Sequence, residues 1–122
     1  MILALNIVTG IVALLHIWFM TLETFLWTKP QGLRAFNMTS AEAENTKILA
    51  MNQGIYNGVL AAGLIWGIVH PFGALGLQIK AFFLCAVAVV GVFGSYTVSR
   101  KIFFVQALPA LIALVLEWWI LQ

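Results

Sequence analysis

Four long apolar blocks dominate this sequence and decide the environment in which it can fold. A helix needs about 20 mainly apolar residues to cross a bilayer, and four segments reach that length: residues 2–27, 48–69, 77–98 and 102–121. Only 8% of the residues are charged, too few to cover a surface in water. We therefore predict an all-α integral membrane protein, an antiparallel four-helix bundle that forms a single domain over residues 1–122.

Composition argues against several other classes of protein. The chain is too apolar for a disordered protein, and its six basic residues form no stripe that could follow nucleic-acid phosphates, so we expect no nucleic-acid partner. Cys85 is the only cysteine, which excludes an intrachain disulfide. Neither histidine has a glutamate three or four residues away on its helix, so we expect no metal and no cofactor.

The connections carry recognisable local signals. Residues 29–32 (Lys-Pro-Gln-Gly) predict a turn that ends the first helix, because Pro fixes its own φ and Gly accepts the left-handed region. Residues 39–42 (Thr-Ser-Ala-Glu) have the spacing of a capping box, so we expect the second helix to begin before the membrane does. Pro109 predicts a kink in the fourth helix, near Gln106.

Small residues at helical spacing predict close helix packing. The second span has two such faces, one with Gly54 and Gly58 and one with Gly63 and Gly67, and the third span has Gly91. Two faces on one helix exceed what one neighbour within the chain needs. From this we predict a homodimer.

The polar residues inside the predicted spans are the candidates for function. His16 and Glu23 lie two helical turns apart on one stripe of the first helix, and a titratable pair inside a membrane exceeds what helix association requires. Counting depth along each span places further polar side chains near them, which we take as ligand-binding residues: Asn52, Gln53, Tyr56, Asn57 and Gln106. We assign Asn6 and Thr9 to helix association, and we expect Lys80 and Glu117 to form a structural salt bridge or a snorkelling pair.

Several runs of residues resemble a known family, the bacterial and fungal membrane proteins labelled domain of unknown function 1304. The resemblance covers nearly the whole chain and rests on the runs at residues 23–27 (Glu-Thr-Phe-Leu-Trp), 46–47, 52–58 (Asn-Gln-Gly-Ile-Tyr-Asn-Gly), 60–64, 99–101, and 106 with 109–110. It implies a four-span integral membrane protein and supplies no activity. We expect the bacterial inner membrane as its location.

Three functions fit these features. In the first, Glu23 and His16 bind a small lipophilic ligand or process it by acid–base chemistry, because a carboxyl group held out of water tends toward its protonated form. In the second, the protein is a dimeric small-molecule or proton-coupled transporter. In the third, the polar residues only fix helix register in a scaffold or assembly subunit.

The basic residues predict which way the chain crosses the membrane. Five of the six flank the first and third connections: Lys29, Arg34, Lys47, Arg100 and Lys101. By the positive-inside rule these connections are cytoplasmic and both termini lie outside the cytoplasm. A reporter that is active only outside the cytoplasm should therefore be active when fused after Gln122. Activity from a reporter that works only in the cytoplasm would reverse this topology.

Overall fold

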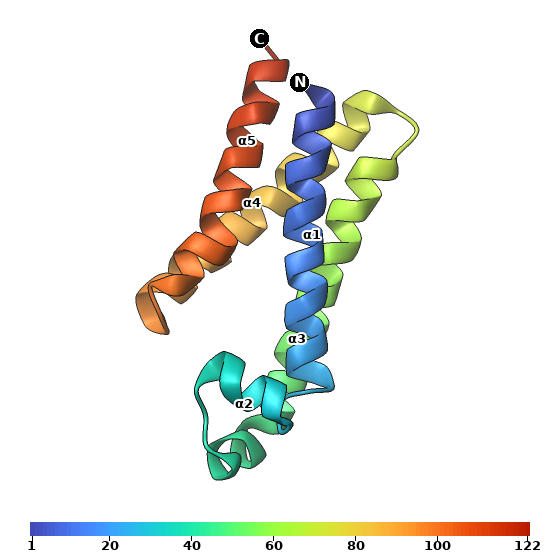
Figure 1. Cartoon of the computed structure of the whole chain (residues 1–122). Coiled ribbons are helices and arrows are strands. Elements are labelled where there is room, and N and C mark those ends of the chain that lie inside the picture. Colours follow the sequence, from blue (N-terminus) through green and yellow to red (C-terminus); the bar gives the residue numbers. More distant parts are fainter. The chain divides into compact units, whose positions relative to one another are not determined.

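The computed structural model describes all 122 residues, Met1–Gln122, and contains helices without strands. The elements are α1 (Ile2–Thr24), α2 (Pro30–Phe36), α3 (Ser40–Val69), α4 (Gly73–Thr97), the π-helical segment η1 (Phe103–Ala107) and α5 (Leu108–Ile120) (Figure 1). Four stretches are long and apolar enough to cross a membrane: Ile2–Thr24, Ser40–Val69, Gly73–Thr97 and Phe103–Ile120. The predicted all-α fold, a four-helix bundle of an integral membrane protein, is confirmed.

The chain divides into two compact units. The first unit comprises Met1–Leu15 and Leu60–Gln122, and the second comprises His16–Val59. Helices α1 and α3 each contribute residues to both. The first unit therefore holds the beginning of α1, the end of α3 and all of α4, η1 and α5, whereas the second holds the end of α1, α2 and the beginning of α3.

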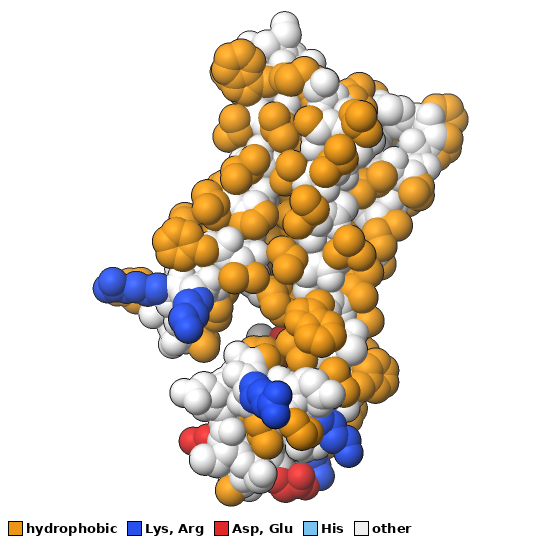
Figure 2. All heavy atoms as spheres, in the orientation of Figure 1, with side chains coloured by type: hydrophobic (Ala, Val, Ile, Leu, Met, Phe, Trp, Pro, Cys, Tyr) orange, Lys and Arg blue, Asp and Glu red, His pale blue; other side chains and the backbone are white.

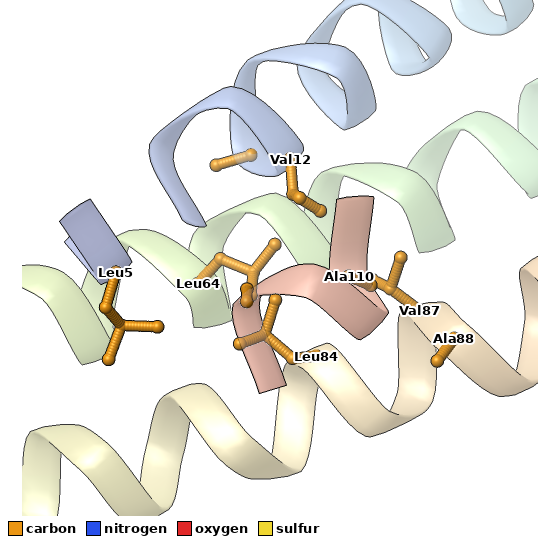
Figure 3. Close-up of a cluster of buried hydrophobic side chains, with 9 residues drawn as sticks. Leu5, Val12, Leu64, Leu84, Val87, Ala88 and Ala110 are labelled. Atoms are coloured by element: carbon orange, nitrogen blue, oxygen red, sulfur yellow. The ribbon is translucent and has the colours of Figure 1, made fainter. Parts of the chain in front are cut away.

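A compact apolar core holds the first unit together. Its buried side chains are Leu5, Val12 and Ala13 of α1, Leu64 of α3, Leu84, Val87 and Ala88 of α4, and Ala110 and Ala113 of α5 (Figure 3). On α4 these residues recur at helical spacing and form one stripe, which buries one side of the helix. The alanines of α5 let its backbone approach the larger side chains of α4 closely.

Hydrophobic side chains also cover most of the helices on the outside (Figure 2). They include large residues such as Leu14, Phe82 and Trp119, each more than 60% exposed. In water, contiguous apolar surface of this extent would drive aggregation. In a bilayer it contacts lipid tails, so the exposed surface agrees with the membrane location that composition predicts.

Glycines mark the closest helix contacts in the first unit. A Cβ atom added at Gly63 would overlap the ring of Phe83, and one added at Gly91 would lie 2.7 Å from the backbone nitrogen of Ala107. At Gly67 it would lie 3.0 Å from the backbone nitrogen of Lys80. The close packing predicted at these small residues is therefore present, between α3 and α4 and between α4 and η1.

The other small-residue face of α3 has a partner as well. In the second unit, Gly54 and Gly58 pack against Thr24 and Met20 of α1. Both faces of α3 thus meet neighbours in the same chain. The premise from which we predicted a dimer, that one face is left over, was wrong, and the dimer itself stays a prediction.

The connection after α1 differs from the predicted turn at residues 29–32. Pro30 is the first residue of α2, a position that suits proline because the missing N–H has no partner in the first helical turn. Gly32 does not adopt the left-handed region. It is required for close approach, since a Cβ there would overlap the carbonyl oxygen of Leu26. The left-handed residue of this unit is Asn37, with φ 49°, which ends α2.

The capping box is confirmed. The backbone N–H of Thr39 donates to Oε2 of Glu42 at 2.8 Å, and the N–H of Glu42 donates to Oγ1 of Thr39 at 3.2 Å. Helix α3 therefore begins at Ser40, eight residues before the apolar stretch. At 1.5 Å per residue, roughly 12 Å of helix precedes the predicted span.

The fourth span contains a change of helix type where we predicted a kink. Five residues, Phe103–Ala107, form a π-helical turn, and Pro109 follows it at the start of α5. Proline lacks an N–H group, so the ordinary hydrogen-bond ladder is interrupted there, and a widened turn is one way to accommodate the interruption. Gln106 lies within this turn.

The contact between α4 and η1 gives a testable prediction. Gly91→Ala should lower the stability by about 1–3 kcal/mol, because the new methyl group would meet the backbone of Ala107, which cannot move aside as a flexible side chain can. Gly10→Ala is the matched control: it also lies within a helix, and a Cβ there has no atom within 4 Å, so it should be neutral or stabilising by up to ~1 kcal/mol. Thermal unfolding of both variants in detergent measures the difference, and equal midpoints would contradict this packing.

Candidate functional site

A buried carboxyl group lies near the end of α1. The side chain of Glu23 is only 5% exposed, and its Oε1 accepts a hydrogen bond of 3.1 Å from the side-chain amide of Asn57 on α3. Asn57 is itself 7% exposed. The hydrogen bond joins residues 34 positions apart in the sequence and fixes one edge of the carboxyl group.

The packing of α1 against α3 in the second unit places these two residues together. Along α1, Met20 and Thr24 are four residues apart, and they contact Gly58 and Gly54, which are four residues apart on α3. The indole nitrogen of Trp27 then donates to Oγ1 of Thr46 at 3.0 Å. The contacts run in opposite directions along the two helices, so these segments are antiparallel, and Glu23 faces α3 as a consequence.

Two polar atoms at this contact have no hydrogen-bond partner. They are Oε2 of Glu23 and Oγ1 of Thr24, and both are buried. A buried polar group without a partner costs roughly 1–3 kcal/mol, so two neighbouring ones are unusual. We call Glu23, Thr24, Gly54 and Asn57 the Glu23 site. It combines a carboxyl group, a hydroxyl group and an amide beside a glycine.

Two members of the Glu23 site were missed in the sequence-based prediction of site residues. Thr24 immediately follows Glu23, and Gly54 precedes Asn57 by three residues, a spacing that puts both on one side of α3. These spacings could have identified both residues. Gly54 was predicted only to pack against a neighbouring helix, although its close packing is what brings Thr24 to the site.

His16, the second predicted catalytic residue, is fully buried on α1. Its ring packs edge-on against Phe19 with centroids 5.6 Å apart. Along the helix axis it is roughly 10 Å from Glu23, because seven residues at 1.5 Å each separate them. The two residues share one side of α1, as their spacing predicts, and they lie two turns apart.

Four of the predicted ligand-binding residues lie outside the Glu23 site. Asn52, Gln53 and Tyr56 have exposed side chains on α3. Gln106 belongs to η1 in the first unit, where it is half-buried with its Cβ against Gly91. Of the seven predicted site residues, the structure joins Glu23 and Asn57 by a hydrogen bond.

The first unit holds a second group of buried polar residues. Lys80 is 4% exposed and donates to Oδ1 of Asn6 at 2.7 Å. Glu117 is 3% exposed, and its Oε2 has no partner. Lys80 and Glu117, predicted as a salt bridge or a snorkelling pair, form no direct ion pair, although their charges interact at longer range. The amide of Asn6, assigned to helix association, provides the partner of Lys80.

Comparison with known proteins places the chain in a family. Residues 10–118 match the model of a protein family of unknown function, DUF1304. The chain belongs to this family. It is similar to the uncharacterized protein YpaA of Lactococcus lactis subsp. lactis, with 37% identity over 111 residues, which cover 89% of this chain and 92% of that protein. No solved structure matches the chain significantly.

The Glu23 site coincides with two of the runs that carry the resemblance to DUF1304 proteins. Glu23 and Thr24 belong to the run at residues 23–27, and Gly54 and Asn57 belong to the run at residues 52–58. The contact between Thr24 and Gly54 and the hydrogen bond between Glu23 and Asn57 join these two runs. In this DUF1304 protein two of the runs on which the resemblance rests therefore meet at one place in the second unit.

Proposed function

We propose that this protein binds a small lipophilic molecule through the Glu23 site. The observation that supports the proposal is the pair of buried polar atoms without partners, Oε2 of Glu23 and Oγ1 of Thr24. Ionisable residues within membrane helices are costly, and they are commonly retained for function. A ligand that bonds to both atoms would remove the cost of leaving them unpaired.

The donor and acceptor properties of these atoms define the chemical class of the ligand. A carboxylate oxygen accepts hydrogen bonds, and a threonine hydroxyl both donates and accepts. A ligand hydroxyl or amide group can donate to Oε2 of Glu23 and accept from Thr24 at the same time. Asn57 already occupies Oε1 and holds the carboxyl group in place. The surrounding membrane favours an apolar body for the rest of the molecule.

Acid–base processing of the ligand is a further step within this proposal. Glu23 would donate or accept the proton, and His16 would serve as its partner. Because the two residues are two helical turns apart, a proton passing between them needs the ligand or a water molecule as an intermediary. Binding needs the Glu23 site alone, so it is the part of the proposal that the geometry supports better.

The proposal predicts the loss of a bound molecule on Glu23→Gln. The wild-type protein, purified in mild detergent from its native membrane, should carry a small hydroxyl- or amide-containing lipophile that mass spectrometry detects. Its amount should fall roughly 10-fold in Glu23→Gln, because losing a hydrogen bond so that a buried polar group stays unpaired costs about 1–3 kcal/mol. Glu117→Gln is the matched control, since it changes the other buried glutamate and leaves the Glu23 site intact.

The scaffold alternative predicts a different result from the same variants. If the bond between Glu23 and Asn57 serves only to join α1 to α3, wild type and Glu23→Gln carry the same small molecules. The variants Glu23→Gln and Asn57→Leu would then differ from wild type in thermal stability alone. That combination of results would contradict ligand binding and favour a structural role for the pair.

We also propose that two copies of the chain associate through the exposed side of α3. Asn52 lies on the face of α3 opposite Gly54, and exposed residues recur there at alternating spacings of four and three: Asn45, Leu49, Asn52, Tyr56 and Val59. This spacing is typical of a seam between two helices. Lipid offers no hydrogen bond to Asn52, whereas the same amide in a second copy can both donate and accept. Transport, the alternative function, also requires a dimer, because four short helices enclose little more space than one binding site.

Cysteine cross-linking tests this dimer. Cys85 is the only cysteine, so the variant Cys85→Ser provides a background in which single cysteines can be introduced. Oxidation in native membranes should cross-link Asn52→Cys and Tyr56→Cys efficiently, and Met51→Cys, which is exposed on a different side of α3, much less. Equal cross-linking at all three positions, or the highest yield at Met51→Cys, would exclude the proposed interface.

A further inference from the structure

An open apolar groove runs along the outside of α4 and α5 in the first unit. Its volume is about 620 Å³, and its lining includes Ala88, Val92 and Tyr96 of α4 and Leu111 of α5. Ser95 also lines it, but the Ser95 hydroxyl donates to the carbonyl of Val92 at 2.6 Å. The groove thus offers hydrocarbon contacts and little hydrogen bonding, which suits an acyl chain better than a polar solute.

Two positive charges follow directly after this groove in the chain. Arg100 and Lys101 are exposed in the turn that joins α4 to η1, four and five residues beyond Tyr96. Basic side chains project from the hydrophobic surface at this turn (Figure 2). Tyr96 lines the groove one residue before the end of α4, so it is the groove residue of α4 nearest to the charges in the chain, and it is 92% exposed. Aromatic residues with a polar tip favour this level of the membrane, where hydrocarbon gives way to headgroups.

No acidic side chain in the first unit neutralises these charges. Its single carboxylate residue is Glu117, which is buried and lies sixteen residues beyond Lys101, roughly 24 Å along the helix. Neither Arg100 nor Lys101 takes part in an ion pair. The basic pair is therefore free to bind an anion, and arginine in particular can bond to a phosphate through two N–H groups.

We propose that the groove and the basic pair together bind one anionic phospholipid. One acyl chain lies along α4 and α5, and the phosphate lies at Arg100 and Lys101, with the ring of Tyr96 beside the glycerol region. The apolar groove selects the acyl chain, and the two positive charges select the phosphate of the same lipid. This site shares no residue with the Glu23 site, so it is independent of the function proposed above.

Native mass spectrometry of the purified protein tests this site with phosphatidylglycerol and phosphatidylcholine that have identical acyl chains. Wild type should bind one phosphatidylglycerol roughly 25-fold more tightly than phosphatidylcholine, since each basic residue at an anionic surface contributes about a fivefold factor. The double variant Arg100→Gln/Lys101→Gln should lose this preference. The matched control Lys29→Gln/Arg34→Gln removes two basic residues from the connection after α1 and should retain it.

A second variant tests the groove itself. Val92→Trp places a large ring in the groove from an exposed position, so it should weaken the binding of both lipids and leave the fold intact. Retained phosphatidylglycerol preference in the Arg100→Gln/Lys101→Gln variant would overturn the proposal. It would also be overturned by equal loss in the Lys29→Gln/Arg34→Gln control, or by full displacement of the lipid with millimolar glycerol phosphate, which has a headgroup and no acyl chain.

Discussion

Close approach of helix backbones at glycine is the constraint on which the rest of this structure depends. In a bilayer, lipid tails are as apolar as leucine, so helices associate through tight van der Waals packing and hydrogen bonds rather than through hydrophobic burial. Helix α3 has glycines for two neighbours: Gly54 and Gly58 meet α1, and Gly63 and Gly67 meet α4. Since these contacts set which side of α3 is buried, they also determine which polar side chains meet a partner and which remain exposed.

The Glu23 site follows from that packing. With Gly54 against Thr24, the next buried position one turn along α3 is Asn57, and its amide reaches Glu23. A larger residue at Gly54 would separate the helices and break the hydrogen bond. At the same contact, Oε2 of Glu23 and Oγ1 of Thr24 have no hydrogen-bond partner within the chain. The helix contact at Gly54 therefore brings the site residues together, and two of their polar atoms remain without hydrogen-bond partners.

The capping box was predicted correctly from local spacing, whereas depth along a span did not determine which polar side chains are buried. The capping box of Thr39 and Glu42 involves residues three apart, so its spacing alone determines it. Counting depth along a span places Tyr56 and Asn57 at nearly the same level, yet each residue turns the helix by about 100°, and only Asn57 is buried. Likewise, depth favoured Glu117 as the partner of Lys80, whereas packing brings Asn6 to its ammonium group.

The role of glycine in residues 29–32 shows why a residue type can be interpreted wrongly even when its importance is clear. Gly32 was assigned to a turn because glycine tolerates the left-handed region, but its requirement is steric and comes from Leu26 and Trp27, outside the motif. Residue type alone does not determine the environment of the polar side chains either. Those on the exposed face of α3 and the buried ones at the Glu23 site have similar chemistry, but packing gives them different surroundings. Asn52 and Tyr56 face outward, whereas Glu23 and Asn57 bond to each other between α1 and α3 and leave Oε2 of Glu23 without a partner in the chain.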